Sequence, residues 1–169
     1  MSGTIVVQNI QGPTSGANAN KVIIPSGQQL YAPGHILQVT TVQTTVYQTW
    51  SSTSWINIWT PTFTPVSSTS QLHFVVSMNY LPEASNAHDT WMDWNGANGV
   101  YYYAMSKASG VSGWSQGNFC VTYTAPSGTT SAATLRIQVR GNGVNTSYHN
   151  YPGTGSNARS SITMFEVAA

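Results

Sequence analysis

The sequence has very few charged residues. Lys, Arg, Asp and Glu together make up nine of the 169 residues, or 5%, whereas a soluble domain ordinarily carries about 25%. Solubility must therefore come from Ser, Thr, Asn, Gln and Gly, a surface typical of shells, fibres and adhesins. A catalytic site usually needs several converging groups with perturbed pKa values, and four acids, one cysteine and four histidines provide few of them. We therefore expect a structural or binding protein and not an enzyme.

Cysteines, long apolar runs and basic clusters are also scarce. Cys120 is the one cysteine of the sequence, so no disulfide can form within the chain. No apolar run approaches the roughly 20 residues that span a bilayer, and the N-terminus has no basic segment followed by an apolar core, as a signal peptide would. The sequence has no Lys or Arg cluster of the kind that binds nucleic acid. We expect no membrane insertion, no nucleic-acid partner and no cofactor.

The first 33 residues differ from the rest of the chain. They hold two short β-prone pieces, around Ile5 and around Ile23, separated by a stretch rich in Gly, Asn and Ser. Two strands with so few large apolar neighbours cannot build a core by themselves. We interpret residues 1–33 as an arm that pairs with another chain or another protein; the alternative is an ordinary first hairpin of the main domain. The residues expected to make the attachment are Ile5, Val6, Val7, Val22, Ile23 and Ile24.

Residues 34–169 alternate apolar and polar side chains and are punctuated by turn residues such as Asn95-Gly96. No stretch of a dozen residues shows the apolar spacing of an amphipathic helix. The alternation is clearest over residues 72–80, 119–124 and 135–140. Further strands are expected over residues 36–50, 55–63, 100–105 and 161–167. The pattern predicts an all-β fold, an antiparallel β-sandwich of the jelly-roll type with a short N-terminal extended arm.

Several short motifs occur in order along the chain. They are Leu37-Gln38-Val39, then Thr64-Pro65 shortly before Leu72, and finally Ser161-Ile162-Thr163-Met164-Phe165-Glu166-Val167. Together they resemble motifs in the C-terminal domains of tail-fibre-like virion structural proteins of marine bacteriophages. The opening of the chain, Gly3-Thr4-Ile5-Val6-Val7, is similar to the start of such proteins. The sequence departs from the pattern at Gln71, where the family usually has Lys, and at Phe165, where it has Met.

The resemblance implies a virion location and a non-enzymatic structural role. It also implies self-association, with a homotrimer favoured, and contact with capsid or tail proteins. No long shaft separates residues 1–33 from the sandwich, which favours a short fibre, a fibre tip or a knob-like capsid decoration that contacts the host surface. The alternative function is that of a carbohydrate-binding module or lectin with a jelly-roll fold.

One segment concentrates the candidate binding residues. Residues 82–94 contain three of the four acids and one of the four histidines, and we interpret them as a loop. Carboxylate and amide oxygens suit sugar hydroxyls or a hard cation, and Trp rings offer stacking faces, but the spacing matches no calcium-loop template and we predict no metal. The alternative is a polar loop whose two Trp cover one end of the sandwich. The predicted contacts with a glycan or receptor are His88, Asp89, Trp91, Asp93 and Trp94.

The remaining chemical groups have structural interpretations. No Gly-x-Ser-x-Gly elbow accompanies the Ser, His and Asp residues, so no hydrolytic triad is predicted. If the tyrosines at 101–103 lie on a strand, at least one ring points outward, toward a glycan or another chain. Cys120 is expected to be buried or in an interface, and Glu166 is expected to pair with Arg136 or Arg140.

The aromatic content and the low charge predict two further properties. Six Trp and nine Tyr are more than one small sandwich buries comfortably, so we expect like chains to cover the surplus in an oligomer. Because so few charges are present, stability is expected to depend little on salt and little on pH between about 5 and 9.

Overall fold

The structure is a computed structural model that describes residues 13–17, 32–82, 87–106, 117–141, 146–151 and 158–169. The chain divides into two units, Met1–Ala32 and Pro33–Ala169. The six attachment residues between Ile5 and Ile24 lie outside the described residues, so the role of the arm stays a prediction. Within the described residues, no helix is long and apolar enough to cross a membrane.

The second unit is made of β-strands. The strands are β1 (Ile36–Thr44), β2 (Gln48–Trp50), β3 (Ile56–Trp59), β4 (Thr62–Phe63), β5 (Gln71–Pro82), β6 (Ala87–Trp94), β7 (Ala97–Ser106), β8 (Gly117–Pro126), β9 (Ala133–Gly141), β10 (Ser147–His149) and β11 (Ser160–Val167). All of the strand pairs are antiparallel. The all-β prediction is therefore confirmed.

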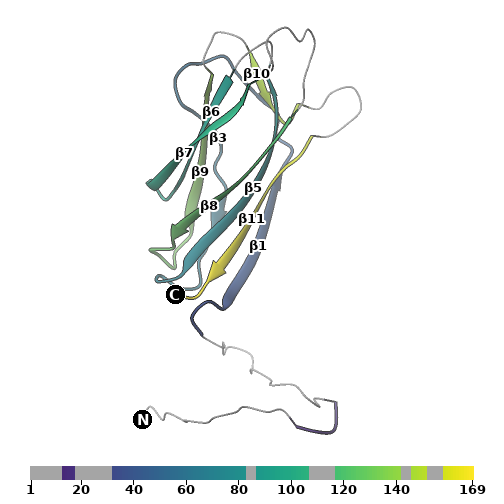
Figure 1. Cartoon of the computed structure of the whole chain (residues 1–169), viewed down its shortest axis with the longest axis vertical. Coiled ribbons are helices and arrows are strands. Elements are labelled where there is room, and N and C mark those ends of the chain that lie inside the picture. The colour runs from purple at the N-terminus through teal and green to yellow at the C-terminus, as the bar shows by residue number, and fades with distance from the viewer. Residues whose placement is uncertain (1–12, 18–31, 83–86, 107–116, 142–145, 152–157) are drawn as a thin grey trace. The chain divides into compact units, whose positions relative to one another are not determined.

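Two sheets face each other across a common core (Figure 1). Sheet A has the strand order β1-β11-β5-β10-β2, with β8 on the other side of β5, and sheet B has the order β3-β9-β6-β7, with β4 also paired to β9. Four of the strand pairs are nested along the chain: β1 with β11, β3 with β9, β5 with β8 and β6 with β7. This is the pairing of a double-stranded ribbon rolled on itself, the jelly roll that the sequence predicted.

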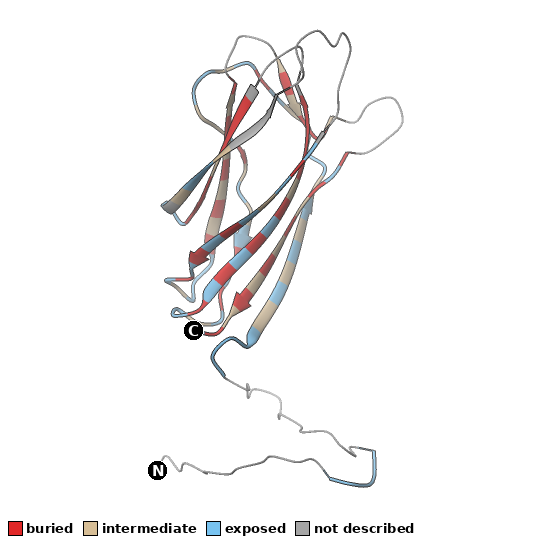
Figure 2. Cartoon of the chain, in the orientation of Figure 1, coloured by how far each residue is buried: buried red, intermediate tan, exposed pale blue. Residues whose placement is uncertain are grey.

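The core lies between the two sheets and follows the period of two that β-strands impose. On β5, Leu72, Phe74, Val76 and Met78 are fully buried, whereas the intervening Val75 is 40% exposed. Figure 2 shows the same alternation along β11 and β9. The side chains that sheet B contributes to the core include Ile58, Met92, Trp94, Leu135, Ile137 and Val139.

Most predicted strands appear where the alternation placed them. Residues 36–50 form two strands and not one, and residues 55–63 form β3 and β4. Two strands were missed. β10 has three residues, too few for a period to show, and β6 falls within residues 82–94, which we had interpreted as a loop.

Cys120 lies on the outer face of sheet A. This surface, formed by the outward side chains of β1, β11, β5 and β8, is called the A face below. The Cys120 thiol is exposed in this chain, so the expectation that it is buried within the sandwich is wrong. The reason is its register: Cys120 pairs with the outward Ser77 of β5, while the neighbouring Phe119 points into the core. Its predicted place in an interface stays a prediction.

Candidate functional site

The described second half of the segment predicted to bind a ligand is a strand and not a loop. β6 covers its second half, and Asn95-Gly96 joins β6 to β7 as a two-residue turn in which both residues have positive φ, 52° and 77°. Such a turn matches the twist of a β-hairpin and favours Asn-Gly. The prediction failed because acidic residues are uncommon in strands, and two of them lie on β6.

The strand alternation separates the five predicted contact residues onto two faces. His88 and Trp94 point into the core, together with Met92. Asp89, Trp91 and Asp93 point to the outer face of sheet B. These five side chains therefore do not form one site, although three of them do come together with residues of neighbouring strands.

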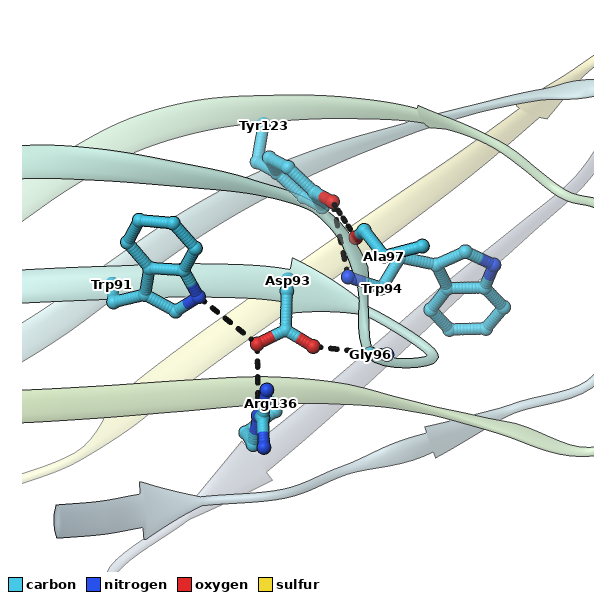
Figure 3. Close-up of polar contacts among 7 residues, drawn as sticks. All are labelled: Trp91, Asp93, Trp94, Gly96, Ala97, Tyr123 and Arg136. Atoms are coloured by element: carbon cyan, nitrogen blue, oxygen red, sulfur yellow. Dashed lines mark hydrogen bonds and ion pairs between the residues drawn. The ribbon is translucent and has the colours of Figure 1, made fainter. Parts of the chain in front are cut away.

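Asp93 binds three donors at the end of the β6–β7 hairpin (Figure 3). Its Oδ2 accepts hydrogen bonds from the Trp91 indole Nε1–H at 3.1 Å and from Arg136 Nε–H at 2.8 Å, and its Oδ1 accepts one from the Gly96 backbone N–H at 3.0 Å. The carboxylate is buried although it carries a charge. A buried charge is tolerated when its partners satisfy it, so Asp93 positions the hairpin and its own oxygens are not available to a ligand.

The inner side of the same hairpin is held by Tyr123 of β8. Its hydroxyl accepts a hydrogen bond from the Trp94 backbone N–H at 3.0 Å and donates one to the Ala97 carbonyl at 3.5 Å (Figure 3). The Trp94 indole Nε1–H donates to the Ser127 carbonyl at 2.9 Å. Trp94 also lines a cavity of about 130 Å³, but its N–H is already bonded, so the residue contributes to the core and not to a stacking surface.

Asp89 forms the second acid–base pair of the outer face. Its Oδ2 accepts a hydrogen bond from Arg140 Nε–H at 2.8 Å, and Asp89 and Tyr101 both raise the pKa of the Arg140 guanidinium. A hydrogen bond with Asp89 is also the main reason that the pKa of the Tyr101 hydroxyl is raised. The Arg140 guanidinium lies 4.7 Å from the centre of the Trp55 ring, a cation–π contact.

Three aromatic rings gather beside these pairs. Trp55, just before β3, lies 6.4 Å from Trp91 and 6.1 Å from Tyr101, measured between ring centroids. Trp91 crosses the neighbouring strand so closely that a Cβ at Gly99 would overlap its indole. Tyr101 is 41% exposed, which confirms that one ring of the tyrosine run points outward.

The outer face of sheet B, called the B face below, can now be defined. It consists of Trp55, Asn57, Asp89, Trp91, Asp93, Gly99, Tyr101, Arg136, Gln138 and Arg140. Its middle row crosses β3, β9, β6 and β7. Gln138 of β9 is in register with Asn57 on one side and with Trp91 on the other, and Trp91 is in register with Tyr101. Sequence reasoning could not find Trp55, Asn57, Gly99 or Gln138, because only the strand register brings them beside Trp91.

His88 occupies a buried polar position behind the B face. Its Nε2 lies 2.9 Å from the Ser147 hydroxyl and its ring packs edge-on against Trp50. Burial lowers the pKa of His88 to about 4, although Asp89 opposes this shift. The Ser147 and His88 side chains are both buried, and Asp89 points to the opposite face of the sheet. This Ser–His pair therefore has neither an orienting acid nor access to a substrate.

The acid predicted to pair with an arginine has other partners. The buried Glu166 carboxylate accepts hydrogen bonds from the backbone N–H groups of Val66 and Ser67, from the Ser70 hydroxyl at 2.6 Å and from the Gln38 amide at 2.6 Å. Burial alone would raise its pKa, but these four donors outweigh burial and hold the pKa below its usual range. The expected pairing with Arg136 or Arg140 is wrong because both arginines lie on the other sheet and are bonded to Asp93 and Asp89.

Among the described residues, no three His, Cys, Asp or Glu side chains come together in a way that could hold a metal ion. Instead, Oδ2 of Asp89 is bonded to Arg140 and Oδ2 of Asp93 is bonded to Arg136.

Comparisons with known proteins show likeness in fold and none in sequence. No model of a known protein family matches the chain, and no curated protein matches it. Among solved structures, a chain in the structure of infectious bursal disease virus, Gt strain, is similar to this protein. The match has a TM-score of 0.50 and 10% sequence identity, and it covers 88% of this chain and 42% of that chain. T=1 particles derived from the same virus are similar with a TM-score of 0.50 and 9% identity, over 90% and 42%. A mutant VP2 protein of that virus, also in derived T=1 particles, has a TM-score of 0.50 and 9% identity, over 93% and 44%. The chain thus spans less than half of each of these proteins, and what it shares with them is the β-sandwich fold.

Proposed function

We propose that this protein is a non-enzymatic structural component of a virus particle that associates with copies of itself. The observation that carries the proposal is the jelly roll, which extends over the described part of Pro33–Ala169 and resembles the fold of a VP2 protein found in virus-derived particles. Jelly rolls are used repeatedly by viral shells and by lectins. Since a fold alone assigns no function, the surface of the sandwich must decide between these uses.

The A face is suited to contact with another copy of the chain. Strand register arranges twelve of its side chains in three rows across β1, β11, β5 and β8. The rows are Val39, Phe165, His73 and Thr124; Thr41, Thr163, Val75 and Thr122; and Gln43, Ser161, Ser77 and Cys120. None of the twelve is an Asp, Glu, Lys or Arg. The exposed Arg159 guanidinium donates to Gln43 at 3.0 Å and so borders the third row, whereas contact through the first two rows would desolvate no formal charge of their own side chains.

The size of the A face indicates how much of the association it supplies. With strands about 4.8 Å apart and same-side residues about 6.8 Å apart, twelve positions cover on the order of 400 Å². A stable interface buries about 800 Å² on each partner. The A face would therefore contribute about half, which agrees with the proposal that residues 1–33 add a second contact by pairing with a sheet edge of another chain.

The kind of virus and the part of the particle are proposed from the resemblance of the sequence to tail-fibre-like virion proteins of marine bacteriophages. We infer a bacteriophage short fibre, fibre tip or capsid decoration, with a homotrimer as the favoured oligomer and the particle as its location. The capsid or tail proteins would then be the partners of the N-terminal arm.

The test is the oligomeric state of the full chain, measured by sedimentation at micromolar concentration. We expect an oligomer, and we expect Val75→Lys, which places a charge at the centre of the A face, to weaken it at least about tenfold in dissociation constant. Val46→Lys is the control, because Val46 is 61% exposed and lies between β1 and β2, outside the twelve positions of the A face. A stable monomer of 18.1 kDa would overturn self-association, and absence of the chain from purified virions would overturn the particle role.

A further inference from the structure

Four of the six charged residues in the described part of the chain lie on the B face. Of the nine charged residues in the sequence, Asp89, Asp93, Arg136 and Arg140 lie there as two ion pairs. Their exposure is unequal: the acid side chains are 3% and 2% exposed, whereas those of Arg136 and Arg140 are 42% and 38% exposed. The carboxylates are thus enclosed, and the guanidinium groups, each held through its Nε–H, stand at the surface.

Because an Arg carries five N–H donors in a planar fork, holding it through Nε fixes the fork without using all of its donors. The two forks flank the middle row of the B face, which holds the half-buried Trp91 and Gln138 and the exposed Asn57 and Tyr101. The surface therefore offers an aromatic area bordered by fixed hydrogen-bond donors and by two amides.

Trp91 is positioned for stacking. A hydrogen bond to Asp93 fixes its indole N–H, and the absence of a side chain at Gly99 lets one side of the ring lie against the β7 backbone. A ring fixed in this way loses little conformational entropy when a ligand packs on it.

We propose that the B face binds a glycan, with a pyranose ring stacked on the Trp91 cluster and its hydroxyls bonded by Arg136, Gln138 and Asn57. A pyranose has an apolar C–H face and a rim of hydroxyl groups, and this matches an aromatic plane bordered by polar groups. The inference deepens the proposed function, since it gives that particle protein a class of receptor.

Nucleic acid fits this surface less well. Bases also stack on aromatic rings, but phosphate binding requires cations that release counterions on contact. Here each guanidinium is already neutralised by a buried carboxylate. A protein partner is the other alternative, since Trp, Tyr and Arg are frequent at the centres of protein interfaces, and the experiment distinguishes it.

The experiment uses the full chain on an array of neutral and acidic oligosaccharides, followed by calorimetric titration of the strongest binder. We expect binding that survives 0.5 M NaCl, because stacking and neutral hydrogen bonds dominate. Gln138→Ala should weaken binding at least about threefold, the loss of one hydrogen bond, and Trp91→Phe should weaken it more. Gln71→Ala, at the exposed start of β5 on sheet A, is the matched control and should bind as the wild type does.

Circular dichroism of each variant shows whether it is folded; Gln138→Ala keeps both ion pairs, so it tests the site even if Trp91→Phe is unstable. Failure of the folded wild type to bind any oligosaccharide overturns the inference, as does equal weakening by Gln71→Ala. Dissociation of an oligomer by Trp91→Phe without any glycan binding identifies the B face as a protein interface and also overturns it. None of these results changes the test of particle assembly, which depends on Val75 of the A face.

Discussion

The indole of Trp91 lies over Gly99, two residues along β7 from its register partner Tyr101, and leaves no room for a side chain on the glycine. A Cβ built on Gly99 would overlap the indole of Trp91, with its Nε1 only 2.7 Å away. The contact explains why a glycine, which weakens strands in general, occupies this position near the start of β7. Because Gly99 lies on β7 and Trp91 on β6, the contact also makes the position of the Trp91 ring on the B face depend on the geometry of the β6–β7 hairpin.

Gly99→Ala should therefore displace Trp91 and destabilise the fold by about 1–3 kcal/mol, the usual effect of overpacking. The measurement is chemical unfolding, together with tryptophan fluorescence. In a Trp91→Ala background the same glycine substitution should have little effect, because the overlapping ring is gone. A double-mutant cycle with no coupling between positions 91 and 99 would contradict the contact.

We expect the Glu166 carboxylate to stabilise the fold, because several uncharged donors hydrogen-bond to it. Glu166→Gln replaces one acceptor oxygen by an amide NH₂ that faces the donors of Val66, Ser67 and Ser70. Unfolding in urea should show a loss of about 2–4 kcal/mol, since buried donors would be left unsatisfied. The contribution exists above the carboxyl's unfolded pKa and disappears as pH falls through its lower folded value.

The matched control for this substitution is Gln38→Ala, which removes one donor and keeps the carboxylate. It should cost less than Glu166→Gln, because three donors still satisfy the charge. If Glu166→Gln is as stable as the wild type, the hydrogen bonds from residues 66–70 make no net contribution to the free energy of unfolding, which would contradict the prediction.

The sequence predicts the fold well because alternation is a property of each strand by itself. Leu72, Phe74 and Val76 mark the inner face of β5 without knowledge of any other strand. The B face could not be predicted in this way. Asp93 meets Arg136, and Asn57 meets Gln138, only through strand register, and no local pattern encodes which strands become neighbours.

The two acids of β6 show again that local sequence does not reveal partners that are distant in the chain. Asp89 and Asp93 made the segment look like a polar loop, since carboxylates rarely lie buried in a strand. Their burial is allowed by arginines that lie 51 and 43 residues further along the chain. The β-prone residues Thr90 and Trp91 between them, and the Asn-Gly turn after Trp94, are the sequence signals that favour a strand here.

Stability should change little with salt, as the low charge predicts. In the described part of the chain, the ion pairs are Asp93–Arg136 and Asp89–Arg140, each with an enclosed carboxylate, and salt screens such pairs less than exposed ones. Melting curves from 0.05 to 1 M NaCl should agree within about 5 °C, a change of roughly 1 kcal/mol for a domain of this size. A larger shift would indicate charge interactions outside these two pairs.

The dependence on pH should be stronger than the low charge alone suggests, because two histidines are buried. His149 Nε2–H donates to the Ser160 hydroxyl at 2.8 Å, since that hydroxyl in turn donates to the Asn150 amide oxygen at 2.7 Å. This fixes the His149 tautomer and leaves its Nδ1 as a buried acceptor without a hydrogen-bond partner. Burial lowers the pKa of His149 to about 4, as it does for His88.

Both histidines bind a proton in the unfolded chain near pH 6.5 and in the folded chain only near pH 4. The unfolded state thus takes up more protons between these values, so the stability present above pH 6.5 falls as pH is lowered toward 4, by roughly 3 kcal/mol for each histidine. Urea unfolding at pH 7.5, 5.5 and 4.5 measures the loss. His149→Gln keeps a donor for Ser160 and should flatten the profile. Equal stability of the wild type at pH 7.5 and 4.5 would show that neither histidine is held neutral by burial.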